Sequence, residues 1–322
     1  MPSSSSSFSS HSGSLLSPST ALDALKSLYT RAPTSAHLLL TFLASYTFTL
    51  ARADYAKFIA IGNGGLLPYN ALGWIMSLLM RPIVLSPARM INPNALPAPE
   101  PADTFLPADL PTRAAPRPTC YGIAPQRQLD GISPHKAAYT TALNDLLAEL
   151  VSAEPDKMYL APSSLEGGSI PALFCSACSS TSAGVAAGGK GEGEGDGEAR
   201  SPTAKLYLSG MPKGEFAHIH RHDGSVHVVL SPADARAALD KGWGQLHSLS
   251  GLAYRGFWLP SLLRTWRPPP TASHNTPPRR ALGPPPTYTF LYAPRSDAEL
   301  ETVKTLIRAA ARFSAGVGGG AA

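Results

Sequence analysis

Histidine is concentrated in one short segment of this 322-residue chain, where five of the nine histidines lie between residues 218 and 247. His218, His220 and His222 alternate with other residues, and alternation along a β-strand places side chains on one face. His227 follows a predicted two-residue turn, so we expect a hairpin in which His220 and His227 are nearly opposite. The sequence therefore predicts a group of imidazoles on one face of a sheet.

Three kinds of site are open for these histidines. Neighbouring imidazoles oppose each other's charge, which lowers their pKa and leaves a neutral ring able to act as a base or to hold a polar substrate. The spacing His-x-His on a strand also suits a metal site, although only Glu215 and Asp223 could add a carboxylate ligand nearby. The third alternative is a structural or surface cluster without chemistry.

Two further stretches contain residues suited to a site. Trp243 lies between two glycines, where its ring can either cover a planar ligand or fill the core. Arg295 follows the segment Tyr292–Pro294 at an expected strand-to-helix junction. Its guanidinium can hold an enolate or carboxylate, or can pair with an acidic residue of the fold.

The elements that must position these residues follow from periodicity, turns and capping residues. Strands separated by turn residues and followed by amphipathic helices indicate an α+β fold, with an antiparallel sheet and helices on one face. Helices are expected to begin at Ser133, Ser231 and Ser296, each next to a helix-start signal. Strands are expected at 156–161, 170–174, 205–208, 215–221, 225–230 and 288–292, with Asp223-Gly224 as the hairpin turn.

An uncharged, partly apolar stretch lies between Arg31 and Arg52. Its length suffices for a helix that crosses a bilayer, and it begins too late for a typical cleaved signal peptide. We therefore expect an N-terminal transmembrane helix at 35–51 that makes the chain a single-pass membrane protein, most simply of an endomembrane. A short interfacial helix is expected near 72–80.

Composition divides the rest of the chain. Ser-rich, Pro/Ala-rich and Gly/Glu-rich segments cannot bury enough apolar surface to pack. The expected parts are a disordered N-terminus (1–34), the anchor (35–51), a membrane-proximal segment (52–91), a linker (92–116), a folded domain (117–313) with flexible insertions at 176–203 and 267–286, and a disordered tail (314–322).

Charge and cysteine content exclude some classes of protein. The net charge is +5, and the basic residues are scattered without interleaved aromatics, so we expect no nucleic-acid partner. Three cysteines do not make a disulfide framework. The pair Cys175 and Cys178 has Cys-x-x-Cys spacing, but without a second pair it is a weak zinc or redox signal.

Several ordered blocks resemble the fungal luciferase family. The similarity covers roughly 50–82, 117–150 and 204–313, and rests on the blocks Asp54–Phe58, Pro125–Gln128, Glu215–His220, Ser225–His227, Lys241–His247 and Tyr288–Arg295. The resemblance implies an oxygenase that uses O2 to oxidise 3-hydroxyhispidin, an α-pyrone, releasing CO2, caffeylpyruvic acid and light. It also implies that neither a metal nor an organic cofactor is needed.

The resemblance leads to specific roles for the site residues. We expect His220 or His227 to remove the enol proton, with His218 and Arg295 stabilising the resulting oxyanion. Contacts with the substrate are expected from Trp243, Gln245, His247 and Tyr292. Two other functions remain open, namely a non-catalytic membrane-anchored domain that binds a small molecule or a protein, and a metal-dependent enzyme that uses the histidine hairpin.

Overall fold

A computed structural model describes residues 18–62, 65, 67–99, 104–114, 116–166, 170–178, 202–252 and 283–316. The chain divides into two compact units, Met1–Ala56 and Lys57–Ala322. In the first unit the described residues form helix α1 (Pro18–Arg31) and most of helix α2 (Pro33–Ala60). Residues 18–31, expected to be disordered, are therefore helical, whereas residues 1–17 lie outside the described part.

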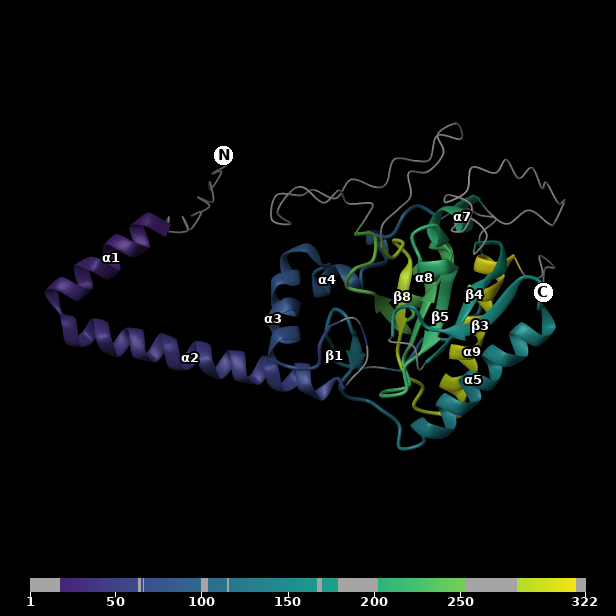
Figure 1. The fold of residues 1–322 in the computed structure, drawn as a ribbon, viewed down its shortest axis with the longest axis horizontal. Helices are drawn as coiled ribbons and strands as arrows, with labels where there is room; N and C mark the ends of the chain where they lie inside the picture. Colours follow the sequence, from purple (N-terminus) through teal and green to yellow (C-terminus); the bar gives the residue numbers. More distant parts are fainter. Residues whose placement is uncertain are drawn as a thin grey trace, which may run out of the picture. The chain divides into compact units, whose positions relative to one another are not determined.

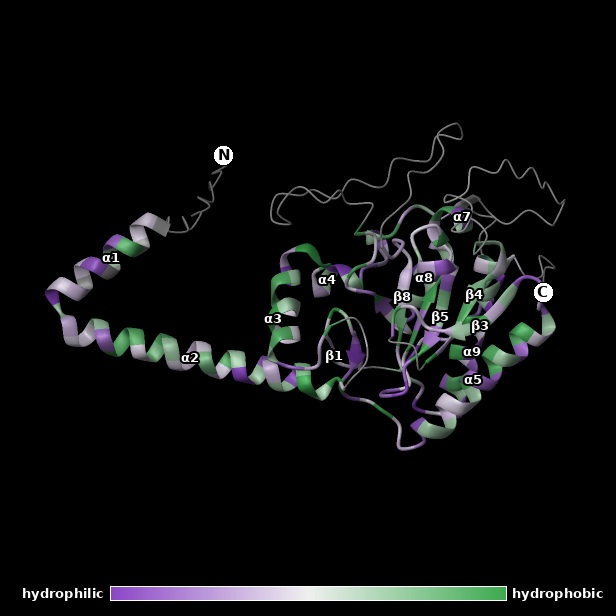
Figure 2. Ribbon diagram, viewed as in Figure 1, coloured by the Kyte–Doolittle hydropathy of each residue, from purple (hydrophilic) through white to green (hydrophobic). Residues whose placement is uncertain are grey.

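The predicted transmembrane helix at 35–51 is wrong. The segment is helical and belongs to the 28-residue helix α2, but no helix in the described part of the chain combines the length and apolar character needed to cross a bilayer. Apolar residues of α2 are interrupted by threonines and serines and, toward its end, by Arg52, Asp54 and Lys57 (Figure 2). The single-pass membrane localisation predicted from this segment is therefore wrong as well.

The second unit is built on a six-stranded sheet that is antiparallel throughout (Figure 1). Its strand order is β3-β4-β5-β6-β8-β7. The bounds are β3 Met158–Pro162, β4 Pro171–Cys175, β5 Glu215–Ile219, β6 Val226–Val229, β7 Gly244–Leu246 and β8 Tyr288–Leu291. With the helices described below, the architecture is α+β.

Helices cover one face of this sheet. Helix α5 (Lys136–Ala153) packs on β3, β4 and β5, and helix α9 (Asp297–Ala315) packs on β5, β6 and α5. The core between them is apolar, which explains the 3.6-residue spacing of the helix residues and the two-residue spacing of the strand residues. It includes Leu143, Leu146, Leu147, Val303, Leu306 and Ile307 from the helices, and Leu173, Ala217, Ile219, Val226, Val228 and Leu291 from the strands.

Serine caps position two of the helices as expected. The hydroxyl of Ser231 accepts from the backbone N–H of Asp234 at the start of α8 (Pro232–Asp240). The hydroxyl of Ser296 accepts from the N–H of Glu299 at the start of α9. Each cap satisfies a backbone donor that the first helical turn leaves without a partner.

The β5–β6 hairpin differs from the prediction in its register. His218, not His220, lies opposite His227, because the turn comprises the four residues 221–224 between the paired His220 and Ser225. The register moves by two residues, and a two-residue shift leaves every side chain on its original face. His220 therefore still faces His227 diagonally, whereas His222 lies in the turn and is exposed.

The opposite face of the sheet carries the histidines and is covered by irregular chain. The covering segments include 163–166 and a two-stranded sheet of β1 (Cys120–Tyr121) and β2 (Arg127–Gln128). Since β5, β6, β7 and β8 are buried along their whole length, both faces of the central sheet are shielded from water. Polar side chains on this face therefore need partners within the protein.

The expected linker at 92–116 instead packs into the domain where it is described. Leu96, Leu106 and Leu110 are buried in the apolar core. The carboxylate of Asp234 accepts from the N–H groups of Phe105 and Leu106, which fastens this segment to α8. Apolar residues spaced among the prolines thus anchor a segment whose composition predicted a free linker.

Other short elements complete the second unit. The predicted strand at 205–208 is wrong, because these residues belong to helix α7 (Pro202–Leu208). The remaining elements are α3 (Ala71–Met80), η1 (Arg81–Ile83), α4 (Pro87–Met90), η2 (Pro93–Ala95) and η3 (Pro212–Gly214). The expected insertions lie outside the described residues at 179–201 and 267–282, and the first two residues of the expected tail close helix α9.

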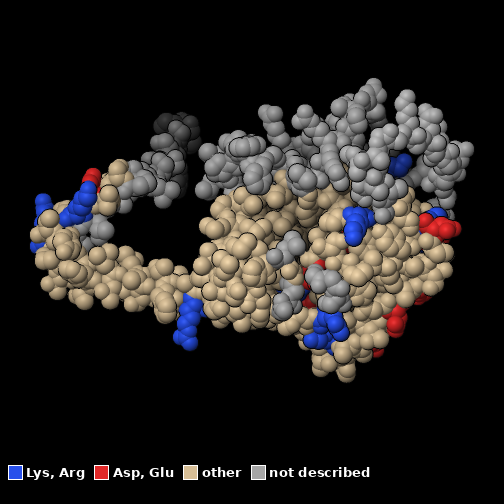
Figure 3. Space-filling model, viewed as in Figure 1, with Lys and Arg blue, Asp and Glu red and all other residues tan. Residues whose placement is uncertain are grey.

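On the face of the molecule drawn in Figure 3, lysine and arginine side chains of the described part stand apart and form no continuous basic patch. A broad basic surface would be the electrostatic footprint of a nucleic-acid partner.

Candidate active site

Three imidazoles, from β5, from the residue directly after β5 and from β6, lie together on the second face of the sheet. The ring centroids of His218, His220 and His227 lie 4.6–5.2 Å apart, and all three side chains are buried. One ring nitrogen of each lies within 4.8 Å of the others. The alternation and the hairpin that predicted this cluster are thus present in the fold.

A β-bulge places a carboxylate beside His218. Ala217 pairs with Leu173 and Glu215 pairs with Phe174, so Phe216 is the extra residue in β5. An extra residue reverses the alternation of side chains, which brings Glu215 onto the histidine face. Its Oε1 lies 2.8 Å from Nδ1 of His218 and also accepts from the Ser163 hydroxyl at 2.7 Å.

His220 is held by a chain of two hydrogen bonds. Its Nδ1 lies 2.7 Å from Oγ of Ser225, and that hydroxyl donates to Oδ1 of Asp223 at 2.7 Å. The serine proton is committed to the carboxylate, so the imidazole must donate through Nδ1–H. This tautomer leaves the lone pair of His220 on Nε2.

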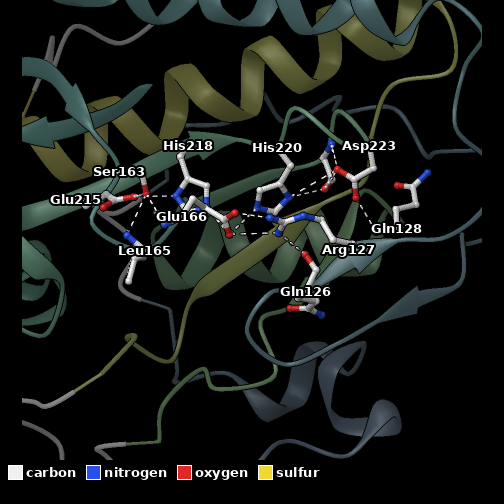
Figure 4. A network of polar contacts seen from close by, with 11 residues as sticks. Gln126, Arg127, Gln128, Ser163, Leu165, Glu166, Glu215, His218, His220 and Asp223 are labelled. Atoms are coloured by element: carbon white, nitrogen blue, oxygen red, sulfur yellow. Dashed lines mark hydrogen bonds and ion pairs between the residues drawn. The ribbon is translucent and has the colours of Figure 1, made fainter. Parts of the chain in front are cut away.

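A buried ion pair adjoins the cluster (Figure 4). The guanidinium of Arg127 binds the carboxylate of Glu166, and a second nitrogen of the same group donates to the Gln126 carbonyl at 2.9 Å. The Oε1 atom of Glu166 lies 3.5 Å from Nε2 of His220 and 3.8 Å from Nε2 of His218. The carboxylate is therefore close to both rings without forming a hydrogen bond to either Nε2.

The inward nitrogens of the three rings have no hydrogen-bond partner in the structure. These atoms are Nε2 of His218, Nε2 of His220 and Nδ1 of His227. A buried polar atom without a partner loses its hydration and gains nothing in return. Three such atoms on rings that lie in contact make the cluster a candidate binding site.

Burial keeps two of these rings neutral. It lowers the pKa of His220 well below its usual value, and the positive charges of Arg127 and of neighbouring imidazoles act in the same direction. For His227, burial is again the largest cause, followed by the neighbouring imidazoles. Both rings therefore carry a free lone pair at neutral pH, as a base or a metal ligand requires.

The predicted residue His247 lies beside the cluster. Its ring centroid is 4.8 Å from that of His227. Its Nδ1 accepts from the N–H of Leu249 at 3.0 Å, and burial lowers its pKa to about 3. Tyr288 stacks on His227 with centroids 4.9 Å apart, so aromatic groups close one side of the cluster.

The other predicted contact residues differ in how near they lie to the cluster. Gln245 is paired across the sheet with Phe290, whose ring contacts His227, and the Gln245 side chain accepts from the Tyr292 hydroxyl at 3.2 Å. Trp243, in contrast, is buried in the apolar core and donates its indole N–H to the Pro111 carbonyl. Its ring thus has the core-filling position that the sequence left open.

Arg295 makes its contacts away from the histidines. Its guanidinium binds the Glu299 carboxylate and the Ala114 carbonyl, and Glu299 also pairs with Arg113 at 3.3 Å. These contacts match the second alternative that the sequence left open for Arg295, an ion pair with an acidic residue of the fold. The proposed role in oxyanion stabilisation stays a prediction without a described contact to the imidazoles.

Sequence spacing indicated Glu215 and Asp223 as nearby carboxylates, and both lie beside the cluster. It missed Glu166 and Arg127, which reach the cluster from two distant places in the chain. A signal for Arg127 was present, because it lies in the Pro125–Gln128 block quoted above. For Glu166 the sequence offers none, since a single acidic residue in a loop has no distinguishing pattern.

Comparison with known proteins identifies the domain that contains this site. Residues 213–310 match the family described as Luciferase domain. This range includes β5, β6, β7, β8, α8 and most of α9, and therefore all three converging histidines. This part of the chain is a Luciferase domain.

Individual fungal luciferases show how far the similarity extends. The luciferase of Neonothopanus nambi is 25% identical over 267 residues, which cover 83% of this chain and 82% of the relative. The luciferases of Armillaria gallica and Armillaria mellea are each 33% identical over 98 residues, or 30% of this chain and 27% of the relative. No solved structure gives a significant match. The Luciferase domain and the similarity to these fungal luciferases support a luciferase-like function.

Proposed function

We propose that this luciferase-family protein oxidises an electron-rich, enolic small molecule with molecular oxygen, and that the reaction takes place at His218, His220 and His227. The substrate class is an α-pyrone such as 3-hydroxyhispidin, or a related phenolic metabolite. The proposal rests on three buried imidazoles that each offer one nitrogen within 4.8 Å of the others and that each have one ring nitrogen without a hydrogen-bond partner. They lie within the segment that matches the Luciferase domain.

The reaction needs no external reductant. 3-Hydroxyhispidin and O2 together contain all the atoms of caffeylpyruvic acid and CO2, so the substrate itself supplies the electrons. Loss of the enol proton makes the ring electron-rich enough to donate an electron to O2. A cyclic peroxide then forms, its O–O bond breaks, and CO2 leaves. The protein must therefore remove a proton, stabilise an anion and exclude water.

The histidine face can supply the first two requirements. A neutral imidazole can accept the enol proton directly or hold a cation that makes the enol more acidic, and both depend on a free lone pair. Arg127 is a buried positive charge next to this face, which makes it our choice for stabilising the anion. We prefer it to Arg295, whose contacts are with Glu299 and Ala114.

Aromatic neighbours of the histidines supply the third requirement, the exclusion of water. Tyr288 and Phe290 lie beside His227, with ring centroids 4.9 and 5.2 Å from it. Aromatic surfaces suit a planar pyrone and keep water from the reacting atoms. This placement supports a flat, conjugated substrate over an aliphatic one.

The proposal is tested with purified full-length protein and 3-hydroxyhispidin in air, following O2 uptake, photons and product mass together. We expect His227→Ala to lower the rate of O2 uptake about 10²–10⁴-fold, the usual effect of removing a proton-transfer group. His222→Ala is the matched control, because His222 is an exposed imidazole in the turn of the same hairpin.

The outcomes separate the parts of the proposal. Equal rates for a folded His227→Ala protein and the wild type would remove the histidine cluster from the reaction. A folded wild-type protein that consumes neither pyrone nor phenolic substrates would reject the substrate class. Product without light would support the oxygenase chemistry alone.

A further inference from the structure

We propose that His218, His220 and His227 form a binding site for a divalent first-row transition-metal ion. The inference concerns the cluster used in the proposed function, but it does not depend on the reaction, because binding is measured without substrate. Among the described residues, this is the group of histidine, cysteine and acidic side chains whose ligand atoms approach one another closely enough for a shared ion.

Hydrogen bonding has already oriented two of the rings for metal binding. His218 contacts Glu215 through Nδ1, and His220 donates through Nδ1 to the Ser225–Asp223 pair. Both rings therefore direct Nε2 inward. Histidines that bind metals almost always donate their other N–H to a carboxylate or a polar group, which fixes the tautomer and the ring orientation.

The spacing of the nitrogens suits one shared ion. Three atoms that lie within 4.8 Å of one another have a common point no more than about 2.8 Å from each, whereas metal–imidazole bonds measure about 2.0–2.1 Å. Small rotations of the side chains close this difference. A site that acted only as a base would need one free nitrogen, and a structural cluster would need none.

Charge gives an independent reason for a cation. Three buried carboxylates, those of Glu166, Glu215 and Asp223, lie beside His218 and His220, and Arg127 is the buried guanidinium among them (Figure 4). With neutral imidazoles the formal charge of this group is −2. A divalent ion would bring it to zero, and buried charge is tolerated when it is compensated.

The ligand set narrows the kind of ion. Imidazole nitrogen is a preferred ligand of zinc, iron, copper, cobalt and nickel, whereas magnesium and calcium prefer oxygen. Three protein ligands leave at least one coordination position free, as in catalytic rather than structural sites. In the proposed reaction such a position would accept the enol oxygen, and the ion would supply Lewis acidity.

Binding is tested first with the metal alone. Full-length protein is stripped with a chelator, exchanged into chelator-free buffer and titrated with Co²⁺, whose visible absorption reports its ligands, and with Zn²⁺ in competition. We expect one ion per chain. His218→Ala should abolish saturable binding, whereas His222→Ala should leave it unchanged. Ser225→Ala should weaken it about 10–100-fold, as for other groups that orient a metal-binding histidine.

X-ray absorption at the edge of the bound metal keeps the test decisive if a variant fails to fold. The spectrum of the wild-type protein should show about three imidazole ligands, as the three-histidine site requires. Sulfur scattering would assign the ion to Cys175 and Cys178 instead and overturn the proposal, as would the absence of saturable binding. Metal binding without turnover would reject the proposed function alone, and turnover by a protein that shows no saturable metal binding would reject this site alone.

Discussion

Replacing Arg127 by methionine should strongly destabilise the domain. Arg127 is the largest of the fully buried side chains in the described part of the chain, and it neutralises the buried carboxylate of Glu166. Methionine retains much of the volume and removes the charge. The change leaves Glu166 buried without a counter-charge and the Gln126 carbonyl without its donor. Breaking a buried ion pair in this way costs about 3–5 kcal/mol.

The measurement is the free energy of unfolding in urea, followed by far-ultraviolet circular dichroism on chelator-treated protein. Arg308→Met is the matched control, since Arg308 pairs with Glu149 at 3.8 Å while 39% and 68% of the two side chains are exposed. An exposed pair contributes about 0–1 kcal/mol, so the control should unfold almost as the wild type does. The double variant Arg127→Met, Glu166→Gln should regain part of the loss, because it removes the uncompensated charge.

If Arg127→Met lowers the free energy of unfolding no more than Arg308→Met does, this reasoning is refuted. It would mean that Glu166 reaches water or takes up a proton at little cost. The carboxylate would then not contribute to the charge of the histidine face, and the electrostatic argument for a cation there would lose one of its three acidic groups.

Two further predictions concern the fold and its pH dependence. Leu143→Ala should destabilise the domain by about 2–5 kcal/mol in the same urea assay, because Leu143 is fully buried between α5 and the sheet; a loss below that of a surface Leu→Ala change would contradict this packing. Burial alone would raise the pKa of Glu299, but hydrogen bonds from Arg295 and the charges of Arg113 and Arg295 outweigh it and lower the pKa. Its stabilising contribution is therefore present above its unfolded pKa and is lost as the pH falls through the folded pKa. The stability difference between wild type and Glu299→Gln should shrink as the pH is lowered from about 6 to 3, and a difference independent of pH would exclude this role.

Local pattern was sufficient to predict most elements of the sheet and its helices. Residues close together in the sequence determine the serine caps at 231 and 296, the apolar stripes of α5 and α9 and the alternation in β5. Such features can therefore be predicted without knowledge of distant contacts. The histidine cluster was predictable for the same reason, because its members lie on one hairpin. The error in register did not affect the predicted cluster, because a two-residue shift leaves each histidine on the same face of the sheet.

Features that depend on distant contacts were not predictable. The bulge at Phe216 turns Glu215 toward His218, and Arg127 meets Glu166 across an interval that no spacing rule covers. Lys205 and its neighbours have the apolar pattern of a short strand but fold as a helix, since short apolar runs fit both states. The uncharged stretch before Arg52 has the length of a membrane span but lacks its apolar character.

The oxidation by O2 is tested most directly by labelling. Wild-type protein is incubated with 3-hydroxyhispidin under ¹⁸O2, and the organic product and released CO2 are analysed by mass spectrometry beside a reaction under argon. The proposed function predicts that substrate is consumed only with oxygen, that one molecule of CO2 is released per molecule of O2, and that ¹⁸O is incorporated into the products. Turnover under argon, or products that carry no ¹⁸O, would contradict it.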